Sequence, residues 1–581
     1  MRDAIAAKAA PAGQGSVWKS GLYLGRIYHG SNTLSPDAIV NNQSHILSRP
    51  AFHLLILCLL ASVLFFYNLG GWDLWNPDEP RYAQVAREMA EDGNWILPRF
   101  NKRIYPDKPP VFFWLIALSY AVSGEVSSYA ARFPSALAGV LGVLLTYLIG
   151  CRLKSSRAGF IAALVLATTV EYFWLGRRAN LDMTLTLFIL GAFFFFYKGY
   201  QDNSSRLYYL FYFFIGLATL TKGPVGFILP LLTVISYLAV KKDLNAVKKV
   251  IFHPGLILFF ALIFAWLIPT VLVGGRAYLD EIIFKQLLGR VYESWSHKEP
   301  FYYYFLSFPP LVIPWVVFLP SALLYAFSSR RRSSGEDTFF PAVWFIVVFV
   351  FFSLCSGKRT LYLLPLVPAC ALMVGCLWDR FFDKDGKDAV SGLVRIPCYL
   401  LLCSSIAASI LLPWFSAFFK SEHQDFNYVG PVLVLTVSTT AALIMFIKKK
   451  EVLTLAMLMV IMAGGFIYSV QYVFPMLNEF NSAKPFSLRI KSLMKDNELL
   501  VSFCHKNDAF IFYTGIGEIR EIKTLPDLRL LVLDPPKRFL LLMKKEDFEK
   551  IASALPFRIY PWEEGKVEDD EFILASNHER S

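Results

Sequence analysis

The chain has 581 residues, of which 55% are hydrophobic, 16% aromatic and only 18% charged, and its formal net charge is +12. A soluble protein of this length could not bury so much apolar surface, so the composition excludes a soluble enzyme. The positive charge is not a nucleic-acid signature, because no basic patch alternates with aromatic residues in a soluble domain. We therefore predict an α-helical protein that crosses a membrane many times.

The N-terminal segment, residues 1–50, is polar and lacks an apolar region followed by a cleavage site, so it does not resemble a secretory signal. We interpret it as cytoplasmic. Basic clusters near 152–157, 241–249, 330–332 and 448–450 then lie on the same side. Short loops rich in lysine and arginine mark the cytoplasmic side of a membrane. The C-terminal region is therefore predicted to lie outside the membrane, in the periplasm of a bacterium.

A transmembrane domain is predicted over residues 51–472, because apolar runs of about 20 residues recur there and each could cross about 30 Å of hydrocarbon. The run 111–123 is too short to span and is predicted to be an interfacial or re-entrant helix. We predict about thirteen transmembrane helices, at 51–69, 131–150, 159–176, 182–199, 207–221, 223–240, 251–273, 304–328, 339–355, 359–378, 394–416, 429–447 and 452–472.

The first outer loop, residues 70–130, is polar and too elaborate to be a simple connector. Its sequence from Asn76 to Pro80 predicts a turn that leads into an amphipathic helix of the kind that lies in a membrane interface. Asp78, Arg81 and Tyr82 are spaced i, i+3 and i+4, so they share one edge of that helix. A second polar cluster follows and contains Tyr105, Asp107 and Lys108.

Three later outer loops carry further candidates. Asp182 is either a helix N-cap or an acidic site residue, and the sequence leaves both open. The loop 274–303 offers Arg290 and His297, although a lone loop histidine is more often a hydrogen-bonding group than a metal ligand. The turn 356–362 supplies two cations and a tyrosine, and the tyrosines could equally form an aromatic belt; its residues of interest are Lys358, Arg359 and Tyr362.

Cations gather on this predicted outer face, where topology does not require them, together with several carboxylates. Arginine and lysine pair with phosphate oxygens, so the pattern predicts a site for an anionic lipid headgroup. The alternative is a set of scattered juxtamembrane charges. The residues concerned are Arg81, Lys108, Lys222, Arg290, Lys358, Arg359, Asp78, Glu79, Asp107 and Asp182.

The predicted spans hold essentially no charged residue in their middle thirds. Transporters usually keep ionisable groups or broken helices near the bilayer midplane. The sequence therefore favours interfacial chemistry over a lipid transporter, and the elaborate first loop argues against a non-catalytic sensor. Residues 473–581 form a separate region, predicted to be a small α/β domain with strands near 498–503, 538–543, 557–560 and 571–575 and a helix at 545–555.

The motifs PDEPRYAQVAREM (77–89) and YPDKPP (105–110), the thirteen spans and the exported domain resemble the lipid A aminoarabinose transferase family. That family is related to the protein O-mannosyltransferases among the polytopic GT-C glycosyltransferases. His297 before PFYY (300–303) and Lys358 before Tyr362 extend the resemblance. The first-loop motifs are specific in combination, and the later ones are weak alone.

The resemblance implies an inner-membrane enzyme that transfers a sugar from an undecaprenyl (polyprenyl) phosphate donor to an envelope acceptor at the outer face. The sugar and acceptor it implies are 4-amino-4-deoxy-L-arabinose and lipid A. A mannosyltransferase-like O-glycosyltransferase, acting on protein or another envelope glycan, is the alternative. No cofactor is required by the sequence, but the family more usually has Glu where this chain has Asp107, its candidate metal ligand.

The family also implies roles for individual side chains. Asp78 would be the carboxylate near the reacting centre, and Asp182 a second acidic group. A larger set of residues would bind the donor phosphate and the substrate, namely Arg81, Tyr82, Tyr105, Lys108, Arg290, His297, Lys358 and Tyr362.

A polyprenyl phosphate is already a good leaving group, so the enzyme must stabilise the departing phosphate and orient the acceptor. Preorganised cations in a water-poor cavity stabilise a departing phosphate. A hydroxyl acceptor would need Asp78 as general base, whereas an ionised lipid A phosphate would need it less. Either displacement inverts the anomeric carbon.

Overall fold

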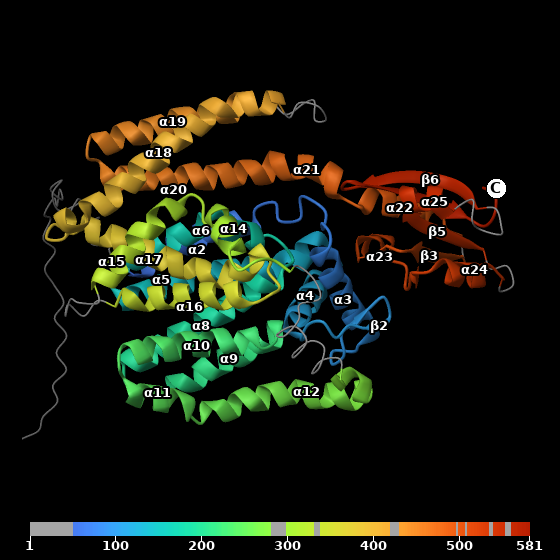
Figure 1. The fold of residues 1–581 in the computed structure, drawn as a ribbon, viewed down its shortest axis with the longest axis horizontal. Helices are drawn as coiled ribbons and strands as arrows, with labels where there is room; N and C mark the ends of the chain where they lie inside the picture. The colour runs from blue at the N-terminus through green and yellow to red at the C-terminus, as the bar shows by residue number, and fades with distance from the viewer. Residues whose placement is uncertain are drawn as a thin grey trace, which may run out of the picture. The chain divides into compact units, whose positions relative to one another are not determined.

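The computed structural model describes residues 50–280, 298–329, 337–418, 429–495, 498–505, 508–533, 538–551 and 559–580. The chain divides into two units, 1–52 and 53–581. Figure 1 shows the second unit as a long series of helices followed in the chain by one small sheet.

After the first outer loop, the regular elements that the structure describes in the membrane part are helices. Its elements after the first outer loop begin with α5 (Ser128–Leu153), α6 (Ser156–Ala167), α7 (Val170–Gly176), α8 (Leu181–Gln201), α9 (Leu207–Lys222), α10 (Val225–Val240), α11 (Leu244–Ile251) and α12 (Gly255–Asp280). They continue with α14 (Tyr303–Leu311), η2 (Trp315–Phe318), α15 (Leu319–Ser329), α16 (Phe339–Leu354), η3 (Thr360–Leu366), α17 (Val367–Phe382), α18 (Lys387–Phe418), α19 (Val429–Ile447), α20 (Glu451–Tyr468), η4 (Ser469–Val473) and α21 (Phe474–Asn481).

Seven of the described helices are long and apolar enough to cross a membrane, and two bent pairs raise the number to nine. The shorter apolar helices include α2 (Pro50–Phe66) and α4 (Val111–Ser123), which is short as expected. Each of the thirteen predicted spans coincides with a helix or a bent pair. The polytopic helical class is confirmed, whereas the number thirteen and the topology stay predictions.

The bend between α6 and α7 measures 66° and follows from two adjacent threonines. The Thr168 hydroxyl donates to the Leu164 carbonyl at 2.7 Å, and the Thr169 hydroxyl donates to that of Val165 at 2.7 Å. Side-chain bonds of this kind compete with the helical ladder and bend helices. α7 therefore begins as a separate helix after this bend.

The first outer loop folds into α3 (Asp78–Asp92), the hairpin of β1 (Arg99–Phe100) and β2 (Arg103–Ile104), and α4. The buried Glu88 carboxylate fixes the hairpin on the helix, because it accepts hydrogen bonds from the backbone of Asn101 at 2.8 Å and of Lys102 at 3.0 Å. The C-terminal region covers part of the polar face of α3, where Arg87 donates to the Phe512 carbonyl at 2.9 Å. The location of this helix at a membrane interface stays a prediction.

The C-terminal region is a five-stranded mixed sheet in the order β4–β3–β5–β7–β6. Strands β3, β5 and β7 coincide with predicted strands. The edge strand β6 extends beyond its predicted range, and the edge strand β4 is not predicted from the sequence. Edge strands carry polar, solvent-facing residues, which makes them harder to predict. The elements are α22 (Lys484–Leu493), β3 (Leu499–Phe503), α23 (Asp508–Thr514), β4 (Arg520–Ile522), α24 (Leu525–Leu533), β5 (Phe539–Lys544), α25 (Lys545–Ile551), β6 (Tyr560–Val567) and β7 (Asp570–Ser576).

Candidate active site

A buried ion pair fixes the first outer loop on the bundle. Glu79 and Arg132 are 1% and 0% exposed, and the guanidinium contacts both carboxylate oxygens, at 2.8 and 3.0 Å. Burial alone would raise the pKa of Glu79, but Arg132 and Arg178 hold it at about 2. The remaining Arg132 donors bind three loop carbonyls, those of Leu69, Trp72 and Asp73. The pair is therefore structural.

Asp78, the neighbour of this pair, has a different partner. It is the first residue of α3, and Arg359 donates to its Oδ2 at 2.7 Å from the turn before η3. Their side chains keep 13% and 29% exposure, so a ligand can still reach them. Lys358, the predicted substrate-binding residue of that turn, instead donates to the carbonyls of Glu299 and Cys355 at 2.8 and 2.5 Å. Arg359 therefore supplies the positive charge at Asp78, while Lys358 stabilises the turn through these backbone hydrogen bonds.

A second ion pair joins Asp182, in the first turn of α8, to Lys222 at the end of α9. Asp182 is 2% exposed. The alternative that Asp182 is the helix N-cap is wrong, because the Asn180 side chain takes that place and accepts from the Asp182 backbone at 2.7 Å. The Lys222 ammonium also lies over the Tyr362 ring, 4.2 Å from its centroid.

The two ion pairs belong to one site. Lys108 and Arg359 both interact electrostatically with Asp182, and Asp78 does so with Lys222. We call these five residues the paired-charge cluster. The cluster joins the first outer loop, α8, α9 and the turn before η3. All five residues belong to the outer-face charges named from the sequence, although the family resemblance assigns no role to Lys222 or Arg359.

The remaining first-loop candidates lie beside the cluster. Arg81 forms a forked ion pair with Asp508 of α23, at 3.0 and 2.5 Å. Burial would lower the pKa of the Arg81 guanidinium, but Asp508 raises it above its ordinary value. Burial raises the pKa of the phenols of Tyr82 and Tyr105, and the nearby charges of Asp78 and Asp107 add to this effect. Both phenols therefore stay protonated and can donate hydrogen bonds.

The candidate metal ligand, Asp107, is half-buried next to this group. Within the described ranges, no three His, Cys, Asp or Glu side chains are grouped so as to hold a metal ion. A metal contact at Asp107 stays a prediction. Two further predicted residues, Arg290 and His297, lie outside the described part of the chain.

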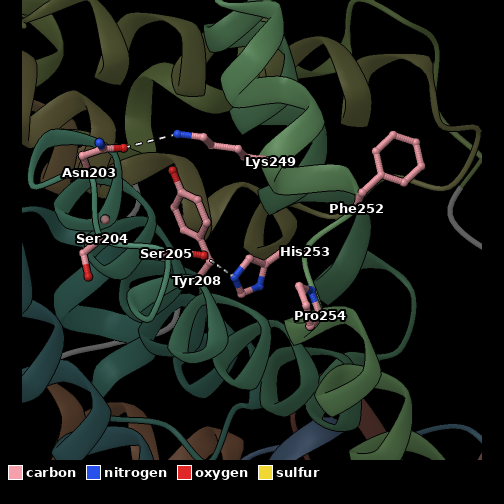
Figure 2. Close-up of a pocket in the computed structure, with 9 residues that line it drawn as sticks. Asn203, Ser204, Ser205, Tyr208, Lys249, Phe252, His253 and Pro254 are labelled. Atoms are coloured by element: carbon pink, nitrogen blue, oxygen red, sulfur yellow. Dashed lines mark hydrogen bonds between the residues drawn. The ribbon is translucent and has the colours of Figure 1, made fainter.

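A small cavity of about 170 Å³ lies where α8 ends and α9 begins, at the ends of these helices that are away from Asp182 and Lys222 (Figure 2). It contains a serine–histidine contact, Ser205 Oγ to His253 Nε2, of 3.0 Å. Because His253 Nδ1 already accepts from the Gly255 backbone at 2.9 Å, Nε2 carries the hydrogen and donates to Ser205. The histidine cannot act there as a base. The cavity lies about 30 Å, one helix length, from Asp182, and is not the active site.

Comparisons with known proteins point the same way. The family model described as dolichyl-phosphate-mannose-protein mannosyltransferase matches residues 107–268. The chain is 30% identical over 403 residues to the undecaprenyl phosphate-alpha-4-amino-4-deoxy-L-arabinose arabinosyl transferase of Aeromonas hydrophila, covering 67% of this chain and 71% of that relative. It is 29% identical over 476 residues to an uncharacterized protein of Aquifex aeolicus, covering 81% and 88%.

A solved structure shares the fold. The crystal structure of ArnT from Cupriavidus metallidurans bound to undecaprenyl phosphate matches with a TM-score of 0.73 and 19% identity, covering 90% of this chain and 98% of that one. The archaeal oligosaccharyltransferase AglB from Archaeoglobus fulgidus matches with a TM-score of 0.51 and 13% identity, covering 86% and 70%.

Together, the helical fold and these relatives define a multi-pass membrane glycosyltransferase of the GT-C class. Within that class, the chain belongs to the undecaprenyl phosphate-alpha-4-amino-4-deoxy-L-arabinose arabinosyl transferase family. The predicted fold class, family and reaction class are therefore confirmed.

Proposed function

We propose that the protein transfers 4-amino-4-deoxy-L-arabinose from undecaprenyl phosphate to lipid A, at the outer face of the bacterial inner membrane. Residues 1–50 would be cytoplasmic, 51–472 would form the transmembrane domain, and 473–581 would be periplasmic. The names of the relatives support the sugar and the donor. The observation that carries the proposal is the paired-charge cluster, in which cations are fixed by carboxylates before any substrate arrives.

The cluster suits a single displacement at the anomeric carbon. The acceptor oxygen forms a bond to that carbon while its bond to the donor phosphate oxygen breaks, and the electron pair leaves with the phosphate. Lys222, Arg359 and Lys108 would stabilise the negative charge that develops there. If the acceptor oxygen carries a proton, Asp78 is the group to receive it. The displacement inverts the anomeric carbon.

Ion pairing also explains how several cations can be held close together before the donor binds. A buried charge without a partner is costly, and a bound partner offsets that cost. Asp78 and Asp182 hold Arg359 and Lys222 in place while the site is empty of donor. Preorganised charges need little reorganisation during the reaction.

A second candidate is an O-glycosyltransferase that acts on protein. The family model for protein mannosyltransferases matches 107–268, the stretch that contains Lys108, Asp182 and Lys222. This candidate uses the same donor chemistry and differs in the acceptor.

Mass spectrometry of lipid A, from cells with and without the protein, tests the proposal against this alternative. We expect an aminopentose increment on lipid A that disappears when the protein is deleted and returns with the wild-type gene. Unchanged lipid A, together with a lost glycan on an exported protein, would contradict the lipid A proposal and favour the second candidate.

Lys108→Ala is expected to weaken use of the lipid-linked donor. Loss of one charged hydrogen bond to phosphate costs about 1.5–3 kcal/mol, which corresponds to a roughly 10- to 100-fold higher KM for the donor. Initial rates in proteoliposomes at varied donor density would measure it. Lys102→Ala is the matched control, because this exposed lysine of the same loop pairs with Asp92 at 3.0 Å. An unchanged donor KM would remove Lys108 from the phosphate site.

A further inference from the structure

Glu171 is a buried carboxylate that the proposed mechanism does not use. It is the second residue of α7, just after the bend from α6, and it is 7% exposed. α7 packs against α8 and η3, the elements that carry Asp182 and Tyr362. Glu171 also interacts electrostatically with Asp182 and Arg178. It therefore lies next to the paired-charge cluster.

The carboxylates of the paired-charge cluster and Glu79 beside it are neutralised by cations of the protein. Asp78 has Arg359, Asp182 has Lys222, and Glu79 has Arg132. In the part of the chain that the structure describes, the Glu171 carboxylate has neither a hydrogen bond nor an ion pair. Arg178, the cation that acts on it, is committed to Glu79 at 3.3 Å and to the Trp75 carbonyl at 3.2 Å.

A buried carboxylate without a partner is unfavourable for folding. Ionisable groups at membrane depth usually mark sites for substrates, ions or protons. A cationic group of a bound substrate would supply the missing partner of Glu171. The donor sugar of the proposed function has such a group, since a primary amine on a sugar is largely protonated near neutral pH.

We propose that Glu171 binds the 4-ammonium group of the donor sugar and selects this sugar against neutral pentoses. This inference rests on the proposed function. The donor then meets cations at its phosphate end and a carboxylate at its amino end, so that the two ends are recognised by opposite charges. A charge-assisted hydrogen bond from ammonium to carboxylate is stronger than a neutral one, and a neutral hydroxyl in its place leaves the carboxylate uncompensated.

The test compares two polyprenyl phosphate donors in proteoliposomes, one carrying 4-amino-4-deoxyarabinose and one carrying arabinose. For the wild type, we expect kcat/KM to favour the amino donor. Glu171→Gln keeps the size of the side chain and removes its charge, so we expect this preference to fall 10- to 100-fold, mainly through the KM of the amino donor. Glu171→Asp keeps the charge and should retain most of the preference.

A measurement on the wild type alone covers the case in which Glu171→Gln fails to fold. N-acetylation of the donor amine removes its positive charge, and we expect the acetylated donor to be used at least tenfold less well. Equal use of the amino donor and the neutral donors by the wild type, or equal loss of both in Glu171→Gln, would overturn the role of Glu171. A wild type that uses neither unmodified donor would contradict the proposed function itself.

Discussion

Asp78→Asn is expected to lower sugar transfer by a factor of about 10²–10⁴, the range that a positioned acid–base group supplies, while the protein still folds. Asparagine keeps the shape of the side chain but can neither accept a proton from the acceptor nor neutralise Arg359, which contacts Asp78 at 2.7 Å. The rate of product formation from a labelled donor, in proteoliposomes with equal amounts of folded protein, would measure the loss.

Asp92→Asn provides the control for Asp78→Asn. Asp92 ends the same helix, α3, but it is exposed and pairs with Lys102 at the loop surface. Its removal should leave transfer within about twofold of the wild type, as expected for a surface ion pair that contributes little. Normal turnover in Asp78→Asn would refute the catalytic assignment. Equal losses in the two variants would indicate a folding defect.

Arg132→Met is expected to destabilise the protein by about 3–5 kcal/mol, because it leaves Glu79 buried and uncompensated. Three loop carbonyls lose their donor as well. The melting temperature in detergent, followed by tryptophan fluorescence and gel filtration, would report the loss, since Trp72 lies against the guanidinium at 4.4 Å. Arg152→Met is the control, because Arg152 forms a surface pair with Asp202.

The double variant Glu79→Gln/Arg132→Met separates an unpaired charge from a general packing defect. Removing both charges should restore part of the lost stability, since the single variant is penalised mainly for the carboxylate left without its partner. A melting temperature of Arg132→Met equal to that of the wild type would contradict the structural role of the pair. A double variant less stable than Arg132→Met would show that packing outweighs charge there.

Much of the membrane architecture could be predicted, because a membrane imposes a local rule on the sequence. A span needs a continuous apolar run, and such runs are visible without knowledge of any contact. The helix after Asn76 was predictable for a similar reason, since its turn, acidic start and apolar spacing all lie within 20 residues of one another. The parallel core strands β3 and β5 are continuous apolar segments and were also found.

The partners within the site could not be predicted in this way. Asp78 and Arg359 are 281 residues apart in the chain, and Arg81 and Asp508 are 427 apart. Lys358 and Arg359 are adjacent cations in one turn, and only the backbone geometry decides that Arg359 reaches Asp78 while Lys358 binds carbonyls. Asn180 and Asp182 are both good cap residues, so their roles depended on where the helix begins.

The C-terminal domain shows the same limit. It was predicted as a separate module, yet its α23 supplies Asp508 to Arg81, and its Ile519 exchanges two backbone hydrogen bonds of 2.8 Å with the Asn101 side chain. These contacts explain why the polar face of α3 is covered. No local sequence pattern in residues 473–581 predicts these contacts with the first outer loop.

We expect this protein itself to move the amino sugar from a lipid-linked donor onto lipid A. The most direct measurement is mass spectrometry of lipid A after incubation with the purified protein and purified undecaprenyl phosphate-aminoarabinose in vesicles. We predict lipid A that carries the aminopentose, formed only with the donor present and absent with Asp78→Asn. Unmodified lipid A, with folded protein and intact donor confirmed in the same vesicles, would contradict the account.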